Sequence, residues 1–135
     1  MFTKNLNENY KDLLKVAEEN KKSYNSNKPF PNIVFDDFFN DQFLNSILDE
    51  FPDLSKKESI SFKSQKEIKL AGKGESFFGD KTKSFMHFLN SEYFINFIQK
   101  LTGIEEPLFG DPYFQGAGQH EIKKGGLLKV HADFN

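Results

Sequence analysis

The chain has 135 residues and a mass of 15.6 kDa, which suits one ordinary domain and leaves little room for two. Its 18 basic residues, all lysine, and 20 acidic residues give a formal net charge of -2, so the basic excess typical of nucleic-acid binding is absent. Cysteine is absent too, which excludes disulfides and thiolate metal sites. With no apolar targeting segment or long apolar stretch, we expect a cytoplasmic protein whose partners include neither nucleic acid nor membrane.

The first predicted element is an amphipathic helix over residues 5–22, where apolar side chains recur at helical spacing between charged ones. The polar segment 23–28 ends this helix. Residues 1–28 are therefore interpreted as an N-terminal helix and linker, and residues 29–135 as the main domain. The apolar positions of the helix are Leu6, Tyr10, Leu13, Leu14 and Ala17.

A strand followed by a helix is predicted next. Pro29 and Pro31 impose an extended backbone, and the β-branched and aromatic run at residues 33–35 predicts a short buried strand. Asn40 or Asp41 can cap a second helix, which Pro52 closes off. The apolar stripe of this helix consists of Phe43, Leu44, Ile47, Leu48 and Phe51.

The lysine- and serine-rich segment 55–76 alternates weakly between apolar and polar residues at each end, which predicts one or two edge strands with a mobile connection. Two more helices are predicted, from Thr82 to Leu89 and from Ser91 to Leu101. Thr82 and Ser91 serve as their N-caps, and Gly103 stops the second. These helices are expected to supply core residues, namely Phe85, Phe88, Phe94, Phe97 and Ile98.

Turns rich in glycine and proline then separate three short predicted strands, at residues 113–115, 119–122 and 127–134. His131 and Asp133 lie two residues apart in the last of these, so their side chains project from the same face of an extended strand. Such a pair can supply two ligands of the 2-His-1-carboxylate triad that holds non-haem Fe(II). His-x-Asp alone is a weak motif that an exposed strand edge also tolerates.

Several further segments occur in the same order as in a known family. They are Leu101–Leu108, Asp111–Tyr113, Gly116–His120, the Gly125-Gly126 pair and His131–Asn135, preceded by Pro29–Phe38. From about residue 29 to its end, the chain resembles prolyl 4-hydroxylase-like dioxygenases that depend on 2-oxoglutarate and Fe(II).

This resemblance implies an α+β fold in which N-terminal helices pack on the first strands of an incomplete double-stranded β-helix, or jelly roll. It implies that His131 and Asp133 bind Fe(II), that 2-oxoglutarate is the cosubstrate, with ascorbate dependence a family expectation, and that a protein or small-molecule substrate is hydroxylated. The family's distal histidine and basic 2-oxoglutarate anchor have no counterpart in this sequence. We therefore expect the N-terminal part of such an enzyme, inactive as this chain.

Other readings stay open. His120 could face the same cavity and bind the cosubstrate by a hydrogen bond, or simply be satisfied by a backbone carbonyl. His87 is expected to be structural, and Tyr113 to pack against the phenylalanine-rich core. The rival function is a non-catalytic jelly-roll binding module, in which His131 and Asp133 satisfy each other or bind a metal weakly.

Overall fold

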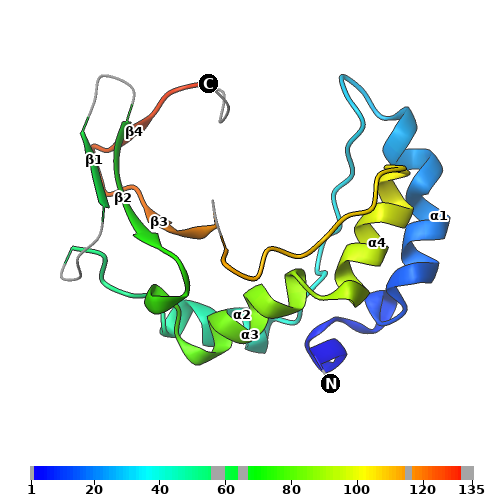
Figure 1. Cartoon of the computed structure of the whole chain (residues 1–135), viewed down its shortest axis with the longest axis horizontal. Helices are drawn as coiled ribbons and strands as arrows, with labels where there is room; N and C mark the ends of the chain where they lie inside the picture. Colours follow the sequence, from blue (N-terminus) through cyan, green and yellow to red (C-terminus); the bar gives the residue numbers. More distant parts are fainter. Residues whose placement is uncertain (1, 56–59, 64–66, 115–116, 132–135) are drawn as a thin grey trace.

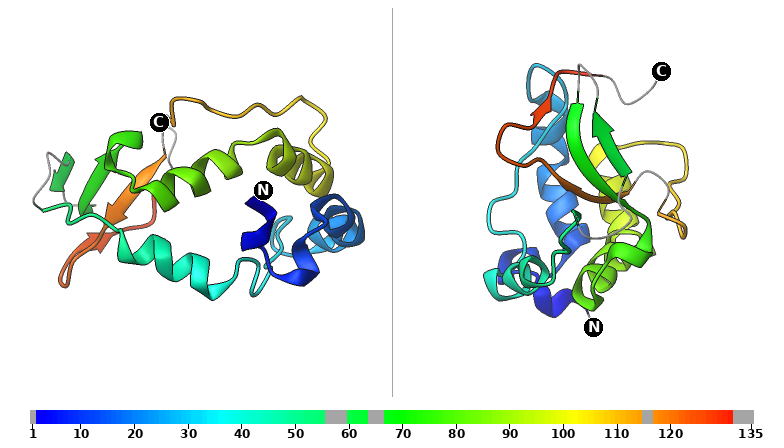
Figure 2. Two further views of the ribbon diagram at one scale, coloured as in Figure 1. Left: turned by 90° about the horizontal axis from the view of Figure 1, so that it is seen from below. Right: turned by 90° about the vertical axis from the view of Figure 1, so that its left-hand side faces the viewer.

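The computed structural model describes residues 2–55, 60–63, 67–114 and 117–131 (Figure 1). These residues form an α+β structure with one antiparallel sheet. The sheet lies at one end of the molecule, α1 and α4 lie at the other, and α2 and α3 lie between them (Figures 1 and 2). The helices are α1 (Leu13–Ser26), α2 (Asp41–Asp49), α3 (Asp80–Leu89) and α4 (Glu92–Thr102), with 3-10 helices η1 (Phe2–Asn5), η2 (Glu8–Tyr10) and η3 (Glu75–Phe77). The strands are β1 (Ile60–Lys63), β2 (Glu67–Lys73), β3 (Gly118–Glu121) and β4 (Leu127–Leu128).

The first long helix begins later than predicted. Of the predicted span 5–22, the part before α1 contains the end of η1 and the short turn η2, and α1 runs on to Ser26. Asp12 sets the start of α1, because its side chain accepts a hydrogen bond from the Lys15 N–H at 3.1 Å. Leu6 is buried as expected, but it lies in a bridge to Phe39 rather than in a helix.

Three of the other helix boundaries match the sequence prediction. Asn40 caps α2 through a hydrogen bond from the Phe43 N–H, and Ser91 caps α4. Gly103 ends α4 with a φ of 76°, a left-handed conformation that glycine adopts without strain. Local capping chemistry was sufficient to place these ends.

The start of α3 was predicted wrongly, since the helix begins at Asp80 and Thr82 lies buried in its first turn. Gly79 occupies the N-cap position, and the carboxylate of Glu50, just beyond α2, accepts hydrogen bonds from the N–H groups of Lys81 and Thr82. Partial burial of this carboxylate raises its pKa, but these hydrogen bonds and the Lys81 charge outweigh that effect. The pKa of Glu50 is therefore held below its ordinary value.

Residues 33–35 form no strand, contrary to the prediction. Among the described residues no strand pairs with this segment, and the Val34 side chain is 79% exposed. Phe35 instead packs against the rings of Tyr10, Phe38 and Phe97. Ile33 and Phe35 therefore supply core contacts from a segment that does not join the sheet, while Val34 points to solvent.

One or two edge strands were predicted within residues 55–76, and two strands are present, β1 and β2, which pair antiparallel with Ile60 opposite Ala71. Only β1 lies at an edge of the described sheet, because β2 also pairs with β3 and β4, so the prediction of an edge position is wrong for β2. The connection 64–66, predicted to be mobile, lies outside the described residues. The other edge of β2 pairs first with β3, with Leu70 opposite Glu121, and then with β4, with Ile68 opposite Leu127.

This register makes β3 and β4 two parts of one interrupted strand. Only Lys69 of β2 separates the residues paired with β3 from those paired with β4, whereas residues 122–126 separate the two segments on the other side. These residues leave the sheet as a loop, in which Gly125 has a φ of 84°. The interruption is larger than an ordinary bulge, which adds a single residue.

Two strand predictions near the end of the chain need correction. The predicted strand 127–134 ends at Leu128 within the described residues, and Lys129–His131 follow without sheet pairing. Pro112 and Tyr113 form a turn rather than a strand, and Gln115 lies outside the described residues. The predicted strand 119–122 is present as β3.

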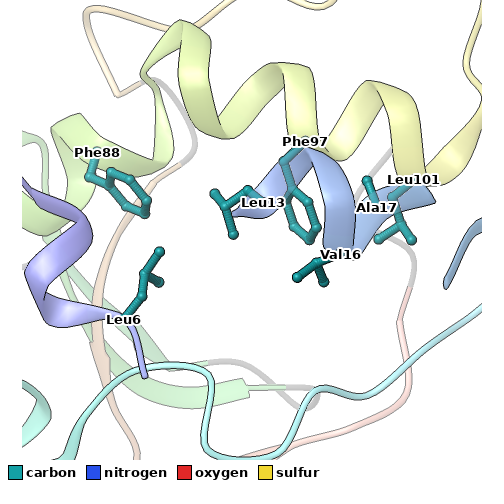
Figure 3. Packing of buried hydrophobic residues seen from close by; sticks show 7 residues of the cluster. All are labelled: Leu6, Leu13, Val16, Ala17, Phe88, Phe97 and Leu101. Carbon is teal, nitrogen blue, oxygen red and sulfur yellow. The ribbon is translucent and has the colours of Figure 1, made fainter. Parts of the chain in front are cut away.

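The main hydrophobic core joins α1 and α4. Figure 3 shows Phe97 and Leu101 of α4 beside residues of α1, with Leu6 and Phe88 nearby. Phe35 and Phe94 pack around this cluster. The prediction that N-terminal helices pack on the first strands is therefore wrong for α1, because α1 packs on α4 at the far end from the sheet (Figure 1). The buried cluster consists of Leu6, Leu13, Val16, Ala17, Phe88, Phe97 and Leu101.

Candidate metal centre

His131 lies in an exposed segment three residues after β4 ends. Its Nδ1 is 2.7 Å from the carbonyl oxygen of Lys129. Since a carbonyl only accepts hydrogen bonds, Nδ1 is the donor, and in the neutral ring the lone pair is on Nε2. Metal-binding histidines are commonly oriented in this way. Asp133, the predicted second ligand, lies outside the described residues.

His120 lies on β3 opposite Ala71 and is exposed, whereas the adjacent Gln119 is buried. The loop 122–126 separates β3 from the segment that leads to His131. Within the described part of the chain, no group of three or more histidine or carboxylate side chains is placed to hold a metal ion. The described structure therefore leaves His131 as a single predicted ligand.

His87 has the structural contacts that the sequence led us to expect. Its Nε2 lies 2.9 Å from Oε1 of Glu75 in η3, and its ring meets that of Phe114 edge-on at a centroid distance of 5.1 Å. Phe114 is buried with only 3% exposure, while Tyr113 is 78% exposed. The prediction that Tyr113 packs in the core is therefore wrong, and its neighbour takes that place.

Sequence reasoning missed a pocket of about 680 Å³ between η1, α2 and α3. Its lining comes from three segments separated by dozens of residues, and no local motif marks them. We call it the N-terminal pocket. It is lined by Phe2, Lys4, Asn5, Asn40, Gln42, Phe43, Ser46, Lys81 and Ser84.

Comparison with family models, curated proteins and solved structures finds no significant match to this chain. Among the described residues, none of the helices combines the length and apolar character needed to cross a bilayer. The structure thus defines an α+β chain with a helical core at one end and a small antiparallel sheet, followed by His131, at the other.

Proposed function

We propose that this chain is the N-terminal part of a 2-oxoglutarate- and Fe(II)-dependent dioxygenase of the prolyl 4-hydroxylase-like kind, with a jelly-roll sheet. The observation that carries the proposal is the ordered series of motifs that ends in His131-x-Asp133. The hydrogen bond from His131 to the Lys129 carbonyl supports it, because Nδ1 is then the protonated nitrogen of the neutral ring and Nε2 is the nitrogen of the type that binds metals. The antiparallel strands that precede the motif also suit a jelly roll.

The donor atoms fit ferrous iron. A neutral imidazole and a carboxylate are the two ligand types of the facial triad, and His131 and Asp133 would supply two of its three ligands. When bound, Fe(II) with 2-oxoglutarate and oxygen supplies the oxidant for hydroxylating a C–H bond. The third ligand and the basic 2-oxoglutarate anchor are not assigned within this sequence, so we expect weak metal binding and no turnover from the chain alone.

The role of this chain's own residues is to present the two donors. The Lys129 carbonyl fixes the tautomer and ring orientation of His131, and the pairing of β4 with β2 fixes where the segment leaves the sheet. His120 remains a candidate for a hydrogen bond to the cosubstrate from its exposed place on β3. The substrate class, protein or small molecule, belongs to the same proposal.

Manganese provides the test, since Mn²⁺ accepts the same nitrogen and oxygen ligands and broadens the NMR signals of nearby nuclei. Titration of the 135-residue chain should selectively broaden backbone amide signals around residues 127–131. His131→Ala and Asp133→Asn should each remove this localised broadening, while the matched variant His120→Ala should retain it. The chain alone should form no succinate from 2-oxoglutarate.

The rival hypothesis is a non-catalytic jelly-roll binding module, and it makes a different forecast in the form in which His131 and Asp133 only satisfy each other. Broadening that survives His131→Ala, or that spreads over exposed carboxylates throughout the molecule, would reject the metal centre and favour the binding module. A further check replaces Mn²⁺ with Mg²⁺, which prefers oxygen ligands and should not perturb the His131 ring signals.

A further inference from the structure

The N-terminal pocket is a cavity of the size that small-molecule sites have. Its volume of about 680 Å³ falls inside the usual range of such sites, roughly 300 to 1,000 Å³. It lies between η1, α2 and α3, so its walls are helical segments rather than loops. It shares none of its lining residues with the proposed metal centre.

The walls of the pocket are held together by hydrogen bonds in which the Asn40 and Ser46 side chains take part. The Asn40 side chain donates to the Lys4 carbonyl at 3.2 Å and accepts from the Phe43 N–H at 2.9 Å. The Ser46 hydroxyl donates to the Phe43 carbonyl at 2.7 Å. These bonds join η1 to the start of α2 and hold the two walls together.

The charged groups at the pocket are positive. Lys4 and Lys81, from η1 and α3, line it together with the amides of Asn5 and Gln42, and its lining as described includes no acidic residue. Lys81 also attracts the Glu50 carboxylate, but the oxygens of that group are directed to N–H groups at the start of α3. The pocket therefore offers two ammonium groups and two amides to a ligand.

The apolar part of the lining is aromatic. Phe2 and Phe43 meet edge to face, with centroids 5.1 Å apart and planes at 89°. Phe2 is itself held by stacking on Phe88 at 4.1 Å. Aromatic rings pack well against other aromatic rings, so the pocket suits a ligand with a flat apolar body.

From these contacts we propose that the N-terminal pocket binds a small organic anion with a flat apolar body. Lys4 and Lys81 attract its anionic group, Asn5 and Gln42 supply hydrogen bonds, and Phe2 and Phe43 contact its body. This proposal is independent of the metal centre and stands or falls separately from it.

The test compares two probes of the same shape and opposite charge, 2-naphthoate and 2-naphthylmethylammonium. In an NMR titration of the full chain, 2-naphthoate should shift backbone amide signals of the pocket residues, and the ammonium probe should not. The double variant Lys4→Gln/Lys81→Gln should weaken 2-naphthoate binding about tenfold, because two exposed charges act together. Rising salt should weaken wild-type binding as well.

A matched control removes the same charge elsewhere. Lys22→Gln/Lys124→Gln changes two exposed lysines outside the pocket and should leave the affinity nearly unchanged. Equal binding of the two probes, equal effects of the two double variants, absence of binding, or shifts centred away from η1, α2 and α3 would each overturn the proposal. All four lysines are exposed, so loss of folding should not obscure the comparison.

Discussion

Replacement of Glu50 should destabilise the protein through a helix that does not contain it. Its carboxylate accepts the N–H groups of Lys81 at 3.1 Å and Thr82 at 2.5 Å, and Gly79 at the N-cap has no side chain to take its place. Loss of a capping side chain costs about 1 kcal/mol, and loss of a negative charge at a helix N-terminus adds about 0.5 kcal/mol. We therefore expect Glu50→Ala to lower the free energy of unfolding by about 1.5 kcal/mol, and Glu50→Gln, which keeps an acceptor, by less.

A substitution at Gly79 provides a second test of the Glu50 cap. A Cβ at this position would overlap the Glu50 carboxylate, although the backbone φ of -73° suits any residue. Gly79→Ala should therefore displace Glu50 and remove the same cap, so that it destabilises the wild type but has little further effect in Glu50→Ala. A double-mutant cycle isolates this coupling.

The assay is urea unfolding followed by far-UV circular dichroism, with Glu105→Ala as an exposed acidic control. Because the folded-state pKa of Glu50 is depressed, its charge stabilises the fold above the ordinary value of 4.5, and this contribution is lost as pH falls through the folded-state value. The stability difference between wild type and Glu50→Gln should shrink accordingly below about pH 4.5. Equal effects of Glu50→Ala and Glu105→Ala, or strict additivity of Glu50→Ala and Gly79→Ala, would refute the cap.

The remaining predictions concern the core, a helix end and a tyrosine hydroxyl. Phe97→Ala should cost about 4 kcal/mol in urea unfolding, because the ring is 2% exposed, whereas Leu48→Ala, at a site 68% exposed, should cost less than about 0.5 kcal/mol. Gly103→Ala should lower stability by about 1 kcal/mol, since its φ is 76°, and asparagine there should be tolerated better when melting temperatures are compared. Tyr93→Phe should cost about 1 kcal/mol in thermal unfolding, because its hydroxyl donates at 2.9 Å to a carbonyl just before α1, while Tyr113→Phe should change nothing measurable.

The parts of the fold that sequence predicted well depend on local chemistry. Asn40, Ser91 and Gly103 mark their helix ends because a cap needs only the residue itself and the next turn. The strand prediction for residues 33–35 was wrong because a strand requires a partner strand, and residues far away in the sequence decide which segments pair. The start of α3 was predicted wrongly for the same reason, since its cap is supplied by Glu50, the residue that follows α2.

For the candidate site, too, the sequence predicted what depends on local spacing and missed what depends on distant residues. The sequence indicated His131 from a spacing rule, and the structure adds the orienting Lys129 carbonyl, which no spacing rule provides. The N-terminal pocket carries no sequence signature, because Lys4, Gln42 and Lys81 become neighbours only when three separate elements meet. Tyr113 and Phe114 show the limit of residue-level reasoning, since the turn at Pro112 and Tyr113 decides which of the two adjacent aromatic rings enters the interior.

The loop between β3 and β4 can change without changing how either segment pairs with β2, which would not hold for a continuous strand. Because β4 pairs directly with β2, this pairing sets the position along the sheet at which the segment leading to His131 begins. The number of residues in the loop 122–126 does not set it. Loop length and composition can therefore vary while the registers on both sides stay fixed. A short peptide inserted between Lys124 and Gly125 should therefore leave the pairing of β3 and β4 with β2 unchanged, so this loop is a position where the sequence can vary without disturbing the sheet.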